Sequence, residues 1–328
     1  MKKIRRIMII IACIMVCGCA NKNETVEMVH SDIDEDFYRV TMGYGFAQKV
    51  GDMLYTQDMQ NIYESMINNG KMENVKVIKD TILDALNVLG DNIYYRDNDD
   101  RLIERTIETG ETRVVFDKAY LTDIYVCPNG YTYALCGREG PFVKIKTEDG
   151  SYEEICKNVM IYAKYGDDLY YIWDKGINEK GEGGTPELWK YSEESGEKEK
   201  IELGYQPISL YVYRDKVYFT TYGDWQLYVY DLKNGEIEKP DVPMMYWYYI
   251  NNDYLYYMDE EMLREEGRSV VKRYNLTKKT TEMVYDGAVL HFTVFTDGSV
   301  VVFEQSGEGY ANVLLEEKNG EWNKTGIR

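Results

Sequence analysis

The sequence predicts an all-β fold: a β-propeller of four-stranded antiparallel blades. The first observation is that an apolar strand, a turn of Gly, Asn or Asp and a second strand rich in Tyr recur along the chain. The copies are residues 51–55, 90–95, 129–133, 166–171, 214–219, 252–257 and 297–301. The second observation is a further Gly-containing turn in almost every copy, and Gly70, Gly110 and Gly150 lie 40 residues apart. Two hairpins of about 40 residues cannot bury an apolar face alone, so such units stack around an axis.

Each repeat is predicted to run strand, turn, strand, loop, strand, turn, strand, because Asn-Gly and Asp-Gly between alternating strands mark hairpins. The copies begin near residues 43, 84, 122, 160, 207, 246 and 289, which predicts seven blades, with six or eight as alternatives. Residues 37–42 could add a strand that clasps the last blade. A β-sandwich would not repeat with this period.

The first 18 residues are predicted to be a lipoprotein signal peptide. A cationic start is followed by an apolar run, residues 7–16, that is shorter than the roughly 20 residues needed to span a bilayer. The run ends in Val16-Cys17-Gly18-Cys19, which resembles a bacterial lipobox. That resemblance implies that Cys19 carries the lipid (palmitate and other acyl chains) and becomes the mature N-terminus. An ordinary secretory signal or an uncleaved anchor is the alternative.

The predicted organisation therefore has three parts. Residues 1–18 are the signal peptide, residues 19–36 a flexible acidic tether, and residues 37–328 the propeller. Two acyl chains would hold the protein at the cell membrane, on its extracytoplasmic face.

The charge of the chain limits its partners. The formal net charge is −19, and loss of the four cationic residues of the signal peptide makes it −23. Because such a surface repels phosphate, we expect no nucleic-acid partner and no electrostatic docking on anionic lipids. We expect a monomer that contacts the membrane through its lipid only.

Motifs for catalysis, cofactors or metals are absent from the sequence. Only His30 and His291 are present, and one histidine in the propeller provides neither a metal cluster nor a triad. Residues 97–100 (DNDD) lack the glycine and distant glutamate of a calcium loop, so we interpret them as a solvated turn. Cys127, Cys136 and Cys156 are an odd set, which favours free thiols over a disulfide framework. We predict no cofactor, no metal and no catalytic residue.

The second strands carry a family resemblance. Residues 93–97 (IYYRD), 169–174 (LYYIWD) and 217–220 (VYFT) resemble the YWTD strands of low-density-lipoprotein-receptor-like propellers. They are still more similar to the bacterial domain DUF5050, found in exported proteins. The resemblance covers about residues 43–328 and implies the fold, but it implies little about function. YWTD propellers usually have six blades, and the seven repeats here depart from that number.

A binding site is predicted where the repetition is interrupted. Most of the 32 tyrosines lie within second strands, where we expect them to pack between blades. Loops after second strands and connections between blades emerge on one face, and the loops at residues 174–186 and 259–269 are enlarged. The aromatic residues predicted near them as ligand contacts are Trp173, Tyr205, Tyr222, Trp225, Tyr246 and Trp247. The alternative is that the long loops are tolerated decoration and that residues 246–247 belong to an inner strand.

Three functions are compatible with these observations. The leading hypothesis is a binding or scaffold propeller that recognises a protein or cell-wall glycan through the loop face of blades 4–6. The alternatives are an exported glycan hydrolase or lyase that uses carboxylates, and a sensor or assembly subunit of an envelope complex.

Overall fold

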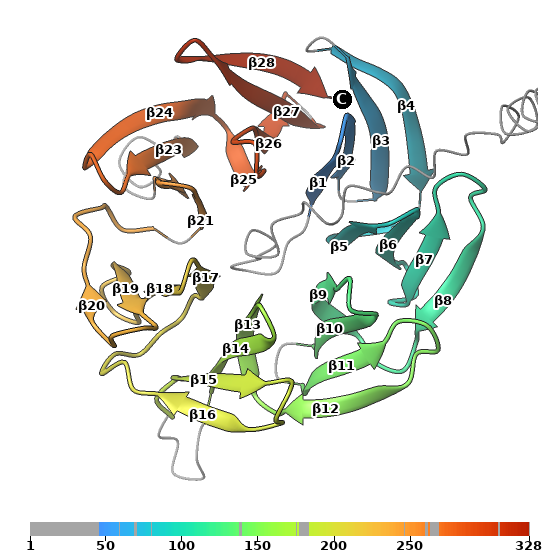
Figure 1. Cartoon of the computed structure of the whole chain (residues 1–328). Coiled ribbons are helices and arrows are strands. Elements are labelled where there is room, and N and C mark those ends of the chain that lie inside the picture. Colours follow the sequence, from blue (N-terminus) through green and yellow to red (C-terminus); the bar gives the residue numbers. More distant parts are fainter. Residues whose placement is uncertain are drawn as a thin grey trace, which may run out of the picture.

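The computed structural model has seven four-stranded antiparallel sheets arranged around a central axis as a β-propeller, as the sequence predicts (Figure 1). It describes residues 46–58, 60–68, 71–79, 81–137, 140–174, 176, 184–245, 247–259, 262, 269–307 and 309–327. In every sheet the strands follow one another in chain order, with the first strand nearest the axis. The predicted signal peptide, tether and clasping strand at residues 37–42 lie outside the described residues.

The first four blades take up the N-terminal half of the chain. Blade 1 contains β1 (Ala47–Val50), β2 (Met53–Gln57), β3 (Asn61–Asn68) and β4 (Lys71–Lys79). Blade 2 contains β5 (Thr81–Leu89), β6 (Asn92–Asp97), β7 (Leu102–Thr106) and β8 (Thr112–Phe116). Blade 3 contains β9 (Leu121–Val126), β10 (Tyr131–Cys136), β11 (Phe142–Lys146) and β12 (Tyr152–Cys156). Blade 4 contains β13 (Val159–Tyr165), β14 (Asp168–Trp173), β15 (Glu187–Ser192) and β16 (Lys198–Ile201).

The remaining three blades complete the ring. Blade 5 contains β17 (Tyr211–Tyr213), β18 (Lys216–Thr220), β19 (Leu227–Asp231) and β20 (Ile237–Glu238). Blade 6 contains β21 (Tyr248–Asn251), β22 (Tyr254–Met258), β23 (Ser269–Asn275) and β24 (Thr280–Gly287). Blade 7 contains β25 (Val289–Val294), β26 (Val300–Ser306), β27 (Gly309–Lys318) and β28 (Glu321–Ile327).

Two faces of the disc follow from this connectivity. We call the face with the hairpin turns between first and second strands and between third and fourth strands the lower face. The upper face carries the loops between second and third strands and the connections between blades.

The lower face repeats one backbone hydrogen bond in blades 1 to 6. The backbone amide of a residue within one position of the end of the third strand donates to a carbonyl of the turn between the first two strands, at 2.7–3.2 Å. The donors are Ile67, Ile107, Thr147, Glu193, Leu232 and Leu276. The lower ends of these six blades are therefore held by the same backbone contact.

A buried tyrosine occupies the same place in the second strand of blades 1 to 6. These residues are Tyr55, Tyr94, Tyr133, Tyr170, Tyr218 and Tyr256, and blade 7 has Val301 there. Each is at most 5% exposed. Burial, and then the charge of Glu64, raises the pKa of Tyr55 to about 12, so the ring stays neutral. The abundance of tyrosine is thus largely a matter of blade packing.

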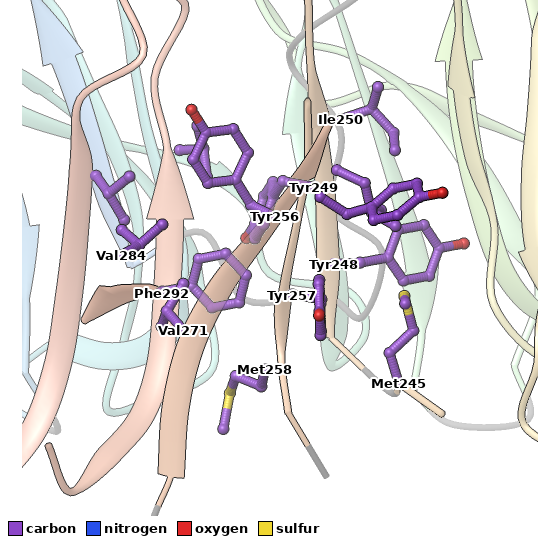
Figure 2. Close-up of a cluster of buried hydrophobic side chains, with 14 of the residues drawn as sticks. Met245, Tyr248, Tyr249, Ile250, Tyr256, Tyr257, Met258, Val271, Val284 and Phe292 are labelled. Carbon is purple, nitrogen blue, oxygen red and sulfur yellow. The ribbon is translucent and has the colours of Figure 1, made fainter. Parts of the chain in front are cut away.

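Alternating side chains of each blade reach the two neighbouring blades. Figure 2 shows this for blade 6, where Tyr256 lies on the side of Phe292 and Tyr248 and Tyr257 lie on the other. Tyr248 reaches blade 5, where its hydroxyl donates to the Tyr218 carbonyl at 3.0 Å. The core is therefore a ring of aromatic and aliphatic layers between blades.

Polar side chains of the innermost strands link neighbouring blades. Asn87 of blade 2 donates to the Ile124 carbonyl at 3.1 Å and accepts from the Val126 amide at 3.0 Å, both in blade 3. Gln48 makes the same double contact from blade 1 to Val88 of blade 2. These buried bonds satisfy backbone groups that the sheets leave unpaired.

The ring closes between blades 7 and 1 by side-chain contacts. Phe46 packs against Phe303 with ring centroids 6.1 Å apart, within an apolar cluster that contains Leu54 and Leu314. Lys49 of blade 1 forms an ion pair with Asp297 of blade 7. In the described part of the chain, each of these two blades is built from its own four strands.

Candidate functional site on the upper face

Exposed apolar side chains gather on the upper face. Among the described residues, large apolar side chains that are well exposed there are Tyr120, Met160, Tyr205, Tyr222, Leu290 and Tyr310. Met160 and Leu290 are the extra residues where the register of the innermost strands of blades 4 and 7 shifts. Such bulges redirect side chains. The upper face therefore presents apolar groups that blade packing does not use.

Tyr205 and Tyr222 lie together above blade 5. The pairing of its first two strands continues beyond β17 and β18, through a bridge between Pro207 and Thr221. The Tyr222 amide then donates to the Gln206 carbonyl at 3.0 Å. The side chains of Tyr205 and Tyr222 are 44% and 73% exposed. We call Tyr205, Tyr222 and Trp225 the blade 5 shelf.

Buried aromatic rings support the shelf from below. The Tyr205 ring lies 4.4 Å from the ring of Tyr228, which stacks on Phe219 at 5.6 Å. Tyr228 is 7% exposed and Phe219 is fully buried. Tyr205 is thus an exposed ring on a rigid aromatic base.

Asp224 fixes the loop that carries Tyr222 and Trp225. Its carboxylate accepts hydrogen bonds from the Gln226 amide and the Tyr228 hydroxyl, both at 3.1 Å, and from the Thr221 hydroxyl. Partial desolvation raises the pKa of Asp224, but these bonds outweigh it and hold the pKa below its usual range. The carboxylate is therefore ionised at neutral pH.

Trp225 has an unusual backbone conformation. Its φ of 53° lies in the left-handed region, which a bulky residue enters only when its surroundings hold it there. The Trp225 amide donates to the Thr221 carbonyl at 3.2 Å, and its own carbonyl accepts from the Met245 amide at 3.4 Å. The connection from blade 5 to blade 6 is thereby tied to the shelf.

The other predicted contact residues lie elsewhere. Trp173 is half-buried between blades 3 and 4, with its ring 6.1 Å from that of Trp189. Trp247 packs on the core of blades 5 to 7, with its ring 4.7 Å from that of His291. Tyr246 and Cys19 lie outside the described residues, as does most of the two enlarged loops. The structure therefore brings together Tyr205, Tyr222 and Trp225.

His291 and Asp123 lie on innermost strands near the upper face. Burial lowers the pKa of His291 to about 4, against a weaker opposing effect of its contact with the Phe292 carbonyl. Its ring lies 4.9 Å from that of Phe46. Burial raises the pKa of Asp123 to about 6, and its φ is 51° at a register shift of β9. Sequence reasoning missed Asp123, because nothing in the local pattern marks that shift.

The remaining chemistry of the site is simple. Residues 97–100 form the predicted turn, in which Asp97 accepts from the Asp99 and Arg101 amides. Within the described ranges, no group of three or more His, Cys, Asp or Glu side chains could hold a metal ion. Nor does any helix in those ranges have the length and apolarity to cross a membrane.

Comparison with known proteins identifies the fold alone. No family model and no curated protein matches the sequence. The resemblance to YWTD and DUF5050 propellers therefore stays a prediction.

Solved structures share the architecture at low sequence identity. A puromycin-hydrolysing peptidase of Mycobacterium tuberculosis aligns with a TM-score of 0.63 and 14% identity over 88% of this chain and 56% of its own. The tricorn protease gives 0.61 and 10% identity over 88% of this chain and 35% of its own. An oligogalacturonate lyase in complex with manganese gives 0.57 and 12% identity over 80% and 84%. This chain thus spans just over half of the peptidase and about a third of the tricorn protease. At such identities the likeness concerns the fold.

Proposed function

We propose that this protein is a lipid-anchored, extracytoplasmic binding propeller that recognises a protein or cell-wall glycan through the blade 5 shelf. The observation that carries the proposal is the exposure of Tyr222. Its side chain is 73% exposed, and it lies on a loop that the hydrogen bonds of Asp224 hold in place. Tyrosine and tryptophan contribute most to binding when they are rigid and exposed before association. The shelf lies between the connections to blades 4 and 6, within the loop face that the sequence favours.

A lipid anchor at Cys19, which the sequence predicts, fits the same role because it would hold the disc close to other envelope components. Cys19→Ala should release the full-length protein from the membrane fraction and abolish metabolic lipid labelling. Cys17→Ala is the matched control and should stay membrane-bound. Unchanged lipid labelling of the Cys19 variant would refute the lipoprotein proposal.

A photo-crosslinking amino acid in place of Tyr222 tests the binding surface in intact cells. We expect covalent capture of a defined partner, or of cell-wall material, from position 222. The control position is Tyr152, which is 51% exposed at the lower end of blade 3. Equal capture from both positions would show that the shelf has no special role.

A further inference from the structure

The lower face contains a cleft between blades 6 and 7 that the proposed function does not use. Its volume is about 470 Å³, which is within the range of small-molecule sites. Its mouth is formed by three tight turns, at Asn252, Gly298 and Asn319. Because these turns are part of the hairpins, the cleft is pre-formed.

The neighbouring cleft between blades 5 and 6 shows why this one is larger. That cleft measures about 270 Å³ and is lined by Tyr213, Lys216 and Val229. At the equivalent register positions, blade 6 has Asn251, Tyr254 and Arg273. Exchange of the Tyr213 ring for the smaller Asn251 opens the space, and Asn251 donates to the Phe295 carbonyl at 2.9 Å.

The charged side chains that line the larger cleft are already paired. Arg273 makes a two-bond contact with Glu317 at 2.6 and 2.9 Å and a further bond to Glu282 at 2.6 Å. Glu316 pairs with Lys318 at 3.1 Å, and Asp297 pairs with Lys49. The guanidinium of Arg273 is therefore already bound by carboxylates, and a charged ligand would have to compete with an existing ion pair.

Uncharged hydrogen-bonding groups are what the cleft offers to a ligand. The Tyr254 hydroxyl and the side-chain amide of Asn319 both line the cleft. Neither group makes a hydrogen bond within the described part of the chain. Asn252 is exposed beside them, and its side-chain oxygen Oδ1 accepts a hydrogen bond from the Arg214 guanidinium at 3.0 Å. Hydroxyl and amide groups both donate and accept, which suits a polyhydroxylated ligand. The Tyr254 ring, held by the Arg273 guanidinium 4.4 Å from its centre, adds an apolar surface for a sugar ring.

We propose that this cleft binds a neutral saccharide unit, through Tyr254, Asn252 and Asn319. The site is distinct from the blade 5 shelf, since it lies on the opposite face and involves blades 6 and 7.

Saturation-transfer NMR with the full-length protein in detergent tests this directly. The probes are neutral hexoses and N-acetylhexosamines, as mono- and tetrasaccharides, with uronic acids and free hexosamines as charged comparators. We expect saturation transfer to neutral probes. Asn251→Tyr, which copies blade 5, should weaken binding at least tenfold. Tyr254→Phe should weaken it roughly fivefold to tenfold, as expected for loss of one hydrogen bond.

Two controls separate the cleft from the rest of the molecule. Lys216→Ala changes the equivalent place in the smaller cleft, and Tyr152→Ala changes an exposed tyrosine at the lower end of blade 3. Both variants should bind the probes as the wild type does. If Asn251→Tyr does not fold, as judged by its thermal transition, Tyr254→Phe decides. No transfer to neutral probes, transfer to charged probes alone, or undiminished binding by the cleft variants would overturn the proposal.

Discussion

The lower face and the upper face of this disc are built on different rules. On the lower face, blades 1 to 6 repeat the same hydrogen bond between the end of the third strand and the first turn. On the upper face, blade 5 extends the pairing of its first two strands through a bridge between Pro207 and Thr221, and it exposes Tyr205 and Tyr222. This comparison distinguishes residues that stabilise the blades from exposed residues that are available for binding.

The position of Glu193 shows that even the regular part tolerates exceptions. Blades 1, 2, 5 and 6 have Ile or Leu there, whereas blade 4 has a carboxylate whose side chain is 12% exposed. It pairs with Lys144 and Lys164, each at 2.9 Å, and accepts from the Tyr133 hydroxyl. This cluster of charged side chains joins blades 3 and 4, at a position where blades 1, 2, 5 and 6 have an apolar residue.

The largest effect should come from removing that carboxylate. Glu193→Gln removes the counter-charge that Lys144 and Lys164 share, and we expect a loss of about 3 kcal/mol in the free energy of unfolding. Urea denaturation measures it, with the exposed neighbour Glu194→Gln as control. A loss as small as that of the control would mean that the cluster is not a clamp.

The same residue predicts an acid effect. Burial raises the pKa of Glu193, but its bonds to Tyr133, Lys164 and Lys144 lower it more, to below the ordinary value of 4.5 for a glutamate. Because the folded state holds this proton less tightly than the unfolded state, its contribution is complete above pH 4.5 and is lost as the pH falls through the folded pKa. Glu193→Gln should therefore flatten the acid limb of the stability curve. An unchanged acid limb would contradict this assignment.

At neutral pH, the next largest effect on stability should come from the link between blades 2 and 3. Asn87→Ala removes the side chain that pairs with both the Ile124 carbonyl and the Val126 amide. Because these buried groups lose that partner, we expect a loss of about 2 kcal/mol in the free energy of unfolding. The exposed Asn98→Ala is the control for thermal or chemical unfolding. Equal stability of the two variants would show that apolar packing alone holds these blades together.

The buried His291 should make the free energy of unfolding depend on pH, because its pKa differs between the folded and unfolded states. Its pKa is about 4 in the folded protein and 6.5 in the unfolded chain. Between these values the unfolded state binds the extra proton, so stability should fall as the pH drops from 6.5 to 4, by up to about 3 kcal/mol. His291→Gln should lose this dependence. The raised pKa of Asp123 works in the opposite direction below pH 6, so wild type and variant should be compared at each pH.

The smallest effect on stability should come from the shelf. Tyr222→Ala should change the free energy of unfolding by less than about 0.5 kcal/mol, because the side chain is 73% exposed. Differential scanning fluorimetry suffices for this measurement. A large loss would assign Tyr222 to the structure and remove the contrast between the two faces.

The fold was predictable because its signals are local. The predicted repeats start at residues 43, 84, 122, 160, 207, 246 and 289, and the first strands start at 47, 81, 121, 159, 211, 248 and 289. Glycine turns and alternating apolar residues encode those positions without reference to other blades. The direction in which a side chain points was harder to predict. Trp173 was expected to contact a ligand, but it lies on the same blade face as Tyr171 and packs against blade 3. Met160, Leu290 and Asp123 depend on register shifts, which arise only when the blades assemble.

The most direct test of the account combines binding and stability in one variant. Tyr205→Ala/Tyr222→Ala should lower partner capture at least tenfold while keeping the wild-type melting temperature within about 2 °C. Tyr310→Ala, an exposed tyrosine of blade 7 on the same face, should capture the partner normally. Full capture by the double variant, or equal loss in the blade 7 variant, would contradict the claim that the blade 5 shelf is the binding surface.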